Sequence, residues 1–119
     1  MIILLVDDDP VVRFAAQHAL TSAGHTVLEA DGGRAALEMA RDARPDLLLL
    51  DVVLDDEDGR ELADRLRELP HLATTPLVFL TGRADAERDR LLERGAAGVL
   101  AKPFDITTLA EAVERLANV

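Results

Sequence analysis

The fold of this chain is decided by residues 45–51, which read PDLLLLD. Four consecutive leucines do not alternate with polar residues, and this is typical of a strand buried on both faces of a parallel sheet. The leucines end at a carboxylate, Asp51. We therefore expect a central strand over Leu47–Leu50 with an acidic side chain at its carboxyl end.

Three further apolar runs also stop at a residue suited to phosphate or metal chemistry. They are Ile2–Val6 before Asp7-Asp8, Leu77–Leu80 before Thr81, and Val99–Ala101 before Lys102. The carboxyl ends of parallel strands share one edge of the sheet, where ligands of open α/β sheets bind. The sequence therefore predicts one pocket holding three carboxylates, one hydroxyl and one ammonium.

Helical patterns alternate with five apolar segments along the chain. Asp9 before Pro10 predicts the first helix start, Gly24 predicts its end, and the more mixed segment His25–Ala30 is typical of an edge strand. The last amphipathic helix is predicted from Ile106, Leu109, Ala110, Val113, Leu116 and Ala117. The fold class is α/β, a (βα)5 doubly wound, five-stranded parallel sheet in the flavodoxin-like order 2-1-3-4-5.

Composition limits the function. The chain has 119 residues, 49% of them hydrophobic, so we expect one globular domain over residues 1–119. A net charge of −10 argues against direct nucleic-acid binding by this domain. No cysteine is present, which excludes thiol chemistry. The apolar runs are far shorter than the roughly 20 residues of a membrane span, and no basic flank marks a signal peptide, so we expect a cytoplasmic protein.

The expected strand order puts the first strand beside the third, and with it Asp7 and Asp8 beside Asp51. Like-charge repulsion among three carboxylates is relieved by protonation or by a bound cation, and such oxygen ligands suit Mg²⁺. The ammonium of Lys102 and a divalent ion would make the site about neutral. A carboxylate in this setting can accept a phosphoryl group, and the hydroxyl of Thr81 can donate to a phosphoryl oxygen.

From Met1 to about Leu116 the chain resembles the receiver domain of two-component response regulators, the CheY-like superfamily. Five short motifs occur in the family's order, each at the end of an expected strand or in the loop that follows one. They are Val6-Asp7-Asp8-Asp9-Pro10, Pro45-Asp46-Leu47-Leu48-Leu49-Leu50-Asp51, Asp58-Gly59-Arg60-Glu61-Leu62, Leu80-Thr81-Gly82 and Lys102-Pro103-Phe104.

The resemblance implies a role for each acidic site residue. Asp51 is the expected phosphoacceptor, taking a phosphoryl group from a sensor histidine kinase or a phosphotransfer protein. Asp8 would bind Mg²⁺ (or Mn²⁺) directly and Asp7 through water. Asp51 and the backbone carbonyl of Val53 would complete the metal ligands.

The resemblance also implies how the signal leaves the site. Lys102 would pair with the phosphoryl group, with the peptide to Pro103 in the cis form. Thr81 would turn inward on phosphorylation and shift the face formed by the fourth helix, fifth strand and fifth helix. A downstream output domain or protein would contact that face, and a homodimer through it stays an alternative.

Two positions depart from the family pattern. Val99 stands where the family often has Tyr or Phe, so an aromatic partner of the Thr81 switch is missing at that position. Asp55 replaces the usual proline after the phosphoacceptor. With the run Asp55-Asp56-Glu57-Asp58, this predicts a solvated, mobile acidic loop.

The function that these features favour is a phosphorylation-dependent signalling switch. It would catalyse its own aspartyl phosphorylation and dephosphorylation and is not expected to be an enzyme that turns over a metabolite. The alternative is a pseudo-receiver, an unphosphorylated module for dimerisation or docking. An Asp-nucleophile phosphatase is disfavoured because Val53 stands where that class needs a second acid, and a flavodoxin-like cofactor protein because no glycine-rich phosphate loop follows the first strand. An effector domain after Val119 stays open.

Overall fold

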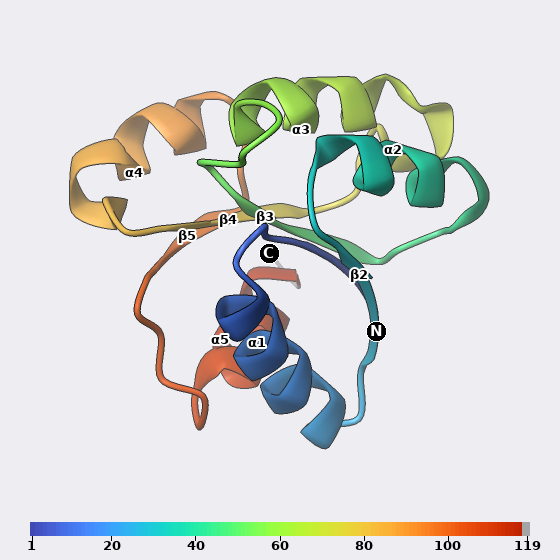
Figure 1. Cartoon of the computed structure of the whole chain (residues 1–119). Helices are drawn as coiled ribbons and strands as arrows, with labels where there is room; N and C mark the ends of the chain where they lie inside the picture. The colour runs from blue at the N-terminus through green and yellow to red at the C-terminus, as the bar shows by residue number, and fades with distance from the viewer. Residues whose placement is uncertain (118–119) are drawn as a thin grey trace.

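A parallel sheet runs through the middle of the molecule (Figure 1). Its five strands lie in the order β2 (Thr26–Ala30), β1 (Ile2–Val6), β3 (Leu47–Asp51), β4 (Leu77–Thr81) and β5 (Gly98–Ala101). This confirms the predicted 2-1-3-4-5 order, with β3 at the centre and β2 at one edge. The computed structural model describes residues 1–117, so Asn118 and Val119 of the expected domain lie outside the described residues.

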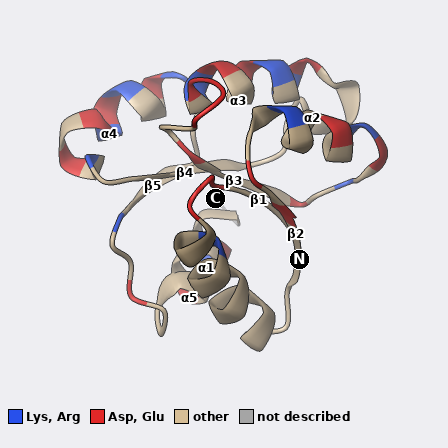
Figure 2. Cartoon of the chain, in the orientation of Figure 1, with Lys and Arg blue, Asp and Glu red and all other residues tan. Residues whose placement is uncertain are grey.

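Helices cover both faces of the sheet (Figure 1). One face carries α1 (Pro10–Ser22) and α5 (Leu109–Ala117), and the other carries α2 (Gly33–Asp42), α3 (Gly59–Glu68) and α4 (Ala84–Glu93), with a 3₁₀ turn, η1 (Pro70–Leu72), after α3. Charged residues are frequent on α2, α3 and α4, whereas α1 is almost uncharged (Figure 2). Within residues 1–117, no helix combines the length and apolarity needed to cross a membrane.

The period of two along a strand divides the core into two halves. Leu48 and Leu50 pack in the half that α2, α3 and α4 cover. Leu47 and Leu49 pack in the half that α1 and α5 cover. All four leucines are fully buried, which confirms the prediction of a central strand without an exposed face.

The ends of α1 follow the sequence signals. The carboxylate of Asp9 accepts a hydrogen bond of 2.9 Å from the backbone N–H of Val11, and Pro10 is the first helical residue. Beyond the helix, Gly24 has a φ of +95°, a conformation that glycine adopts without a steric penalty. Local chemistry alone therefore fixes both ends of this helix.

The prediction that Ile106 belongs to the last helix is wrong. The helix begins at Leu109, and Ile106 lies before it with 53% of its surface exposed. The reason is Asp105, whose side chain accepts hydrogen bonds from both the backbone and the hydroxyl of Thr107. The N–H of Thr108 also donates to the carbonyl of Asp105 at 3.2 Å, so the chain forms a tight turn here before the α-helix begins.

The acidic loop is more than a solvated segment. The carboxylate of Asp56 accepts hydrogen bonds from the first N–H groups of α2, at 3.0 Å from Gly33 and 3.3 Å from Arg34. Asp58 caps α3 through the N–H of Arg60 at 2.8 Å. Two of the acids thus stabilise helix starts, where unpaired N–H groups and the helix dipole favour negative charge.

Candidate functional site

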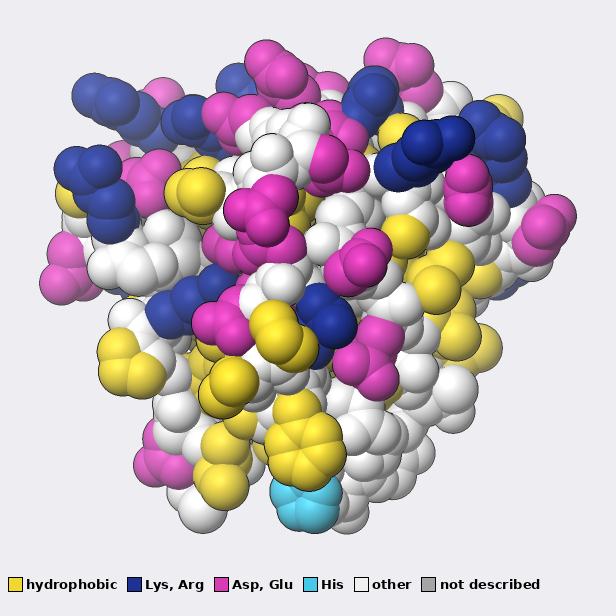
Figure 3. All heavy atoms as spheres, viewed as in Figure 1, with side chains coloured by type: hydrophobic (Ala, Val, Ile, Leu, Met, Phe, Trp, Pro, Cys, Tyr) yellow, Lys and Arg dark blue, Asp and Glu magenta, His cyan; other side chains and the backbone are white. Residues whose placement is uncertain are grey.

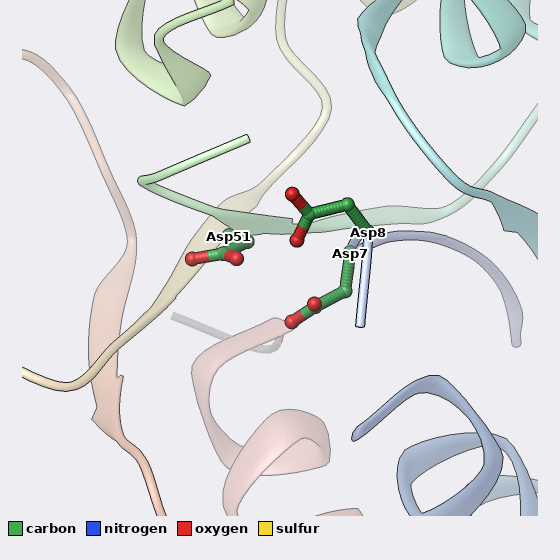
Figure 4. A group of neighbouring side chains, drawn as sticks. All are labelled: Asp7, Asp8 and Asp51. Carbon is green, nitrogen blue, oxygen red and sulfur yellow. The ribbon is translucent and has the colours of Figure 1, made fainter. Parts of the chain in front are cut away.

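Strand register brings the ends of β1 and β3 side by side. Val6 pairs with Leu50, so Asp7 and Asp51 follow neighbouring positions in adjacent strands. The side chains of Asp7 and Asp8 point from the end of β1 toward the side on which Asp51 lies (Figure 4). One carboxylate oxygen from each of the three residues lies within 4.8 Å of the others. The predicted cluster of carboxylates is present.

Two of these acids are taken out of water. Asp7 is fully buried and Asp51 is 6% exposed. Each is held by a backbone N–H two residues ahead, at 2.9 Å from Asp9 to Asp7 and at 3.1 Å from Val53 to Asp51. Val53 therefore orients Asp51 through its N–H group, while the expected contribution of its carbonyl to a metal stays a prediction.

Lys102 reaches the cluster from the end of β5. Its ammonium nitrogen lies 2.6 Å from Oδ2 of Asp7 and 3.1 Å from Oδ2 of Asp51. Its backbone N–H donates to the carbonyl of Thr81 at 2.9 Å, which continues the pairing of β5 with β4. The peptide to Pro103 is cis, as the resemblance implied.

Burial and charge act together on the titration of the site. Burial is the largest effect on Asp51 and raises its pKa, and the charge of Asp7 raises it further against the opposing effect of Lys102. Burial alone would lower the pKa of Lys102, but hydrogen bonds and charges from Asp7 and Asp51 together raise it. The site therefore holds a firmly protonated lysine beside carboxylates with excess negative charge.

A fourth acid stands at the rim of this cluster. The pKa of Asp55 is raised, first by a hydrogen bond with Asp8 and then by the negative charge of Asp8. Asp55 itself is exposed. The acid at position 55 thus brings additional negative charge beside Asp8.

Thr81 lies at the end of β4 and is 3% exposed. Alternate residues of a strand lie on the same face of the sheet, so Thr81 shares its face with Leu77 and Phe79. Both of these residues pack in the half of the core that α2, α3 and α4 cover. Its hydroxyl donates to Oε1 of Glu87 on α4 at 2.9 Å and accepts from the N–H of Arg83 at 3.1 Å. The structure therefore directs Thr81 toward α4.

The sequence interpretation missed Glu87. Its only sequence signal is an acid in the first turn of α4, six positions after Thr81, and such acids are common at helix starts for dipole reasons alone. Contact between its side chain and Thr81 depends on the direction in which α4 leaves β4. That direction is a tertiary property.

The donor set of the cluster fits a hard divalent cation. Its carboxylate oxygens are the ligands that Mg²⁺ prefers, with remaining positions taken by water and phosphate oxygens. The adjacent ammonium of Lys102 suits a phosphoryl oxygen. Fold and site together define a doubly wound α/β domain with a cluster of three carboxylates and one lysine ammonium at the carboxyl edge of its sheet.

Known proteins resemble this chain both in sequence and in structure. Residues 3–114 match the family model of the response regulator receiver domain. The transcriptional regulatory protein CseB of Streptomyces coelicolor is 42% identical over 104 residues, which are 87% of this chain and 43% of that protein. The chemotaxis response regulator CheY4 of Vibrio cholerae has a TM-score of 0.90 at 34% identity, covering 97% of both chains. A putative response regulator from Chloroflexus aurantiacus has a TM-score of 0.90 at 34% identity, covering 99% of this chain and 98% of its own.

The chain therefore belongs to the response regulator receiver domain family of two-component systems. Receiver domains are signalling domains that bind Mg²⁺ at an acidic pocket and interact with histidine kinases and output domains. The chain spans less than half the length of the first curated relatives it matches, which are transcriptional regulatory proteins.

Proposed function

We propose that Asp51 accepts a phosphoryl group from a histidine kinase or phosphotransfer protein, and that the resulting aspartyl phosphate switches the domain between two states. The observation that carries this proposal is the shared position of Lys102. Its ammonium lies within 3.1 Å of one oxygen of Asp51, so it is placed to stabilise negative charge that develops on a phosphoryl group there. The domain would catalyse the formation and hydrolysis of this one bond.

Mg²⁺ (or Mn²⁺) would be held by Asp7, Asp8, Asp51 and the carbonyl of Val53. When bound, the ion would neutralise the carboxylates and the incoming phosphoryl oxygens. Asp7 and Asp51 already use one oxygen each for backbone N–H groups, which fixes the carboxylates before a ligand arrives. Such preorganisation lowers the cost of assembling the transition state.

A protein phosphodonor also needs a surface on which to dock. Exposed apolar side chains gather over α1 and the segment between β5 and α5 (Figure 3). Val11 is 75% exposed and Phe14 is 70% exposed, beside the half-exposed Ile106. An apolar groove of about 160 Å³ there is lined by Val11, Val12, Ala15, Lys102, Pro103, Phe104 and Ile106. Lys102 lines both the groove and the acidic site. A helix of the kinase or phosphotransfer protein that binds in this groove would therefore bring its phosphoryl group to Asp51.

The proposal is tested by incubating the protein with Mg²⁺ and acetyl phosphate, followed by intact mass measurement. One phosphoryl group should be added to the parent protein and none to Asp51→Asn or to the parent in EDTA. With any kinase that phosphorylates the parent, Phe14→Ser should slow transfer from the kinase and leave the reaction with acetyl phosphate unchanged.

The outcome that opposes the proposal is equally clear. Absence of phosphorylation with acetyl phosphate and with a panel of phosphorylated kinases would favour the pseudo-receiver alternative. Phosphorylation that persists in Asp51→Asn would move the acceptor elsewhere. Size-exclusion chromatography of the same phosphorylated sample tests the proposed homodimer. Limited proteolysis of that sample tests the domain bounds 1–119 and the proposed output contact through α4, β5 and α5. We propose a cytoplasmic location as well.

A further inference from the structure

The hydroxyl of Thr81 has one hydrogen to donate, and its partner is a carboxylate on α4. The oxygen lies 2.9 Å from Oε1 of Glu87. The same oxygen already accepts the N–H of Arg83 at 3.1 Å. A hydroxyl donates one hydrogen bond, so Thr81 cannot donate to Glu87 and to a phosphoryl oxygen at the same time.

We propose that Glu87 is a positioning residue of the phosphoryl site, which holds the hydroxyl hydrogen of Thr81 on α4 until a phosphoryl group on Asp51 competes for it. The inference rests on the proposed role of Asp51 and adds the residue that opposes the active arrangement. Glu87 acts through Thr81 and does not touch the reacting atoms.

The competition is between two acceptors of similar strength. A carboxylate and a phosphoryl oxygen both form charge-assisted hydrogen bonds, which are about twice as strong as neutral ones. Thr81 is the last residue of β4, one position beyond Leu80, the partner of Asp51 in the register. A change between staggered side-chain rotamers redirects its hydroxyl without a change in the strand. The presence of the phosphoryl group therefore decides which acceptor is used.

Release of Glu87 has a consequence for α4. The next residue, Arg88, donates from Nη2 to the backbone carbonyl of Val99 at 3.2 Å. Glu87 and Arg88, which are adjacent in α4, thus form hydrogen bonds to the end of β4 and to the edge strand β5. When Thr81 turns away from Glu87, the hydrogen bond to β4 is lost and α4 is freer to move against β5. This route requires no aromatic side chain at position 99.

The test uses the whole chain, Mg²⁺ and beryllofluoride, an anion that binds a carboxylate oxygen as a stand-in for a phosphoryl group. Glu87→Ala should lower the half-saturating beryllofluoride concentration by about three- to tenfold, the net value of a typical intramolecular hydrogen bond. Glu87→Gln should have a smaller effect because its amide oxygen still accepts. Glu93→Ala, which removes an exposed acid from the same helix, controls for the change in net charge.

A double-mutant cycle separates positioning from general destabilisation. Urea unfolding of Thr81→Val, Glu87→Ala and the double variant should show coupling in Mg²⁺ alone. With saturating beryllofluoride the coupling should vanish, because Thr81 has changed partner. Equal coupling in both conditions would overturn the proposal. So would an effect of Glu87→Ala on beryllofluoride binding that is as large in the Thr81→Val background as in the parent. Failure of Asp51 itself is recognised separately, because beryllofluoride would then bind the parent and Asp51→Asn alike.

Discussion

The ammonium nitrogen of Lys102 lies 2.6 Å from Oδ2 of Asp7, although the two residues are 95 positions apart in the chain. Asp7 is fully buried and therefore cannot obtain an equivalent interaction from water. In the metal-free protein this ion pair compensates part of the negative charge that the carboxylates bring together.

Lys102→Ala should destabilise the metal-free protein by about 3–5 kcal/mol, because it leaves a buried carboxylate without its partner. Saturating Mg²⁺ should restore most of this loss, since the ion replaces the missing positive charge. Urea unfolding with EDTA and with Mg²⁺ measures both effects. Lys102→Arg keeps the charge and should lose less stability than Lys102→Ala. An equal loss for the two variants would show that packing and not charge is the cause.

The raised pKa of Asp51 predicts a pH dependence of stability with a definite sign. Because the pKa of Asp51 is higher in the folded chain than its ordinary value of 3.8, ionising Asp51 costs folding free energy. This cost is absent well below pH 3.8 and develops as the pH rises through the raised folded pKa. In EDTA, Asp51→Asn should therefore be increasingly stabilising relative to the parent as the pH rises from 3 to 7. A difference that stays constant across this range would contradict the prediction.

The same protonation competes with metal binding. Apparent Mg²⁺ affinity of the parent should fall as the pH is lowered toward the raised pKa of Asp51, because the metal requires ionised ligands. Isothermal titration at several pH values, with the released protons determined from buffers of different ionisation heat, measures the effect. Proton uptake instead of release on Mg²⁺ binding would contradict it.

Gly59 has a backbone role at the site. A Cβ atom at this position would collide with the backbone carbonyl oxygen of Asp51, and the N–H of Gly59 donates to the carbonyl of Val52 at 2.7 Å. Gly59→Ala should cost about 1–3 kcal/mol, as overpacking against rigid backbone does, and should also weaken phosphorylation. Gly82→Ala is the matched control, since a Cβ there meets nothing within 4 Å. Urea unfolding should show it to be neutral or slightly stabilising.

Asp56 should support α2 from the acidic loop. Hydrogen bonds from the N–H groups, first that of Gly33, lower the pKa of Asp56, so its contribution is present above pH 3.8 and is lost as the pH falls through the lowered pKa. Asp56→Ala should cost about 0.5–1 kcal/mol at pH 7, measured by urea unfolding. Asp55→Ala is the control in the same loop and should not be destabilising, because it removes a charge that opposes Asp8. Equal losses would deny Asp56 its capping role.

Much of the fold and site can be predicted because each strand signal is local. The four leucines of β3 and the polar residues at the strand ends are visible in the sequence, and parallel strands bring their carboxyl ends to one edge. The positions of Asp7, Asp8, Asp51 and Lys102 follow from this. Ile106 was misplaced because a tight turn that begins at Asp105 precedes the helix, and helix starts are poorly defined by periodicity alone.

The side-chain partners could not be predicted in the same way. Glu87 and Asp56 look like ordinary surface acids in the sequence, and only the approach of neighbouring elements gives them partners. The hydrogen bond from Thr81 to Glu87 depends on the angle between β4 and α4, which is set by packing of the whole helix layer.

Periodicity and chain order were enough to predict the order of the five strands and five helices, the residues that reach the carboxyl edge, and the family. The contact of Lys102 with both Asp7 and Asp51, and the hydrogen bond that holds the Thr81 hydroxyl on α4, became visible only in the folded structure. The physical reason is that a hydrogen bond depends on distances of a few tenths of an ångström, and these arise where separate elements meet.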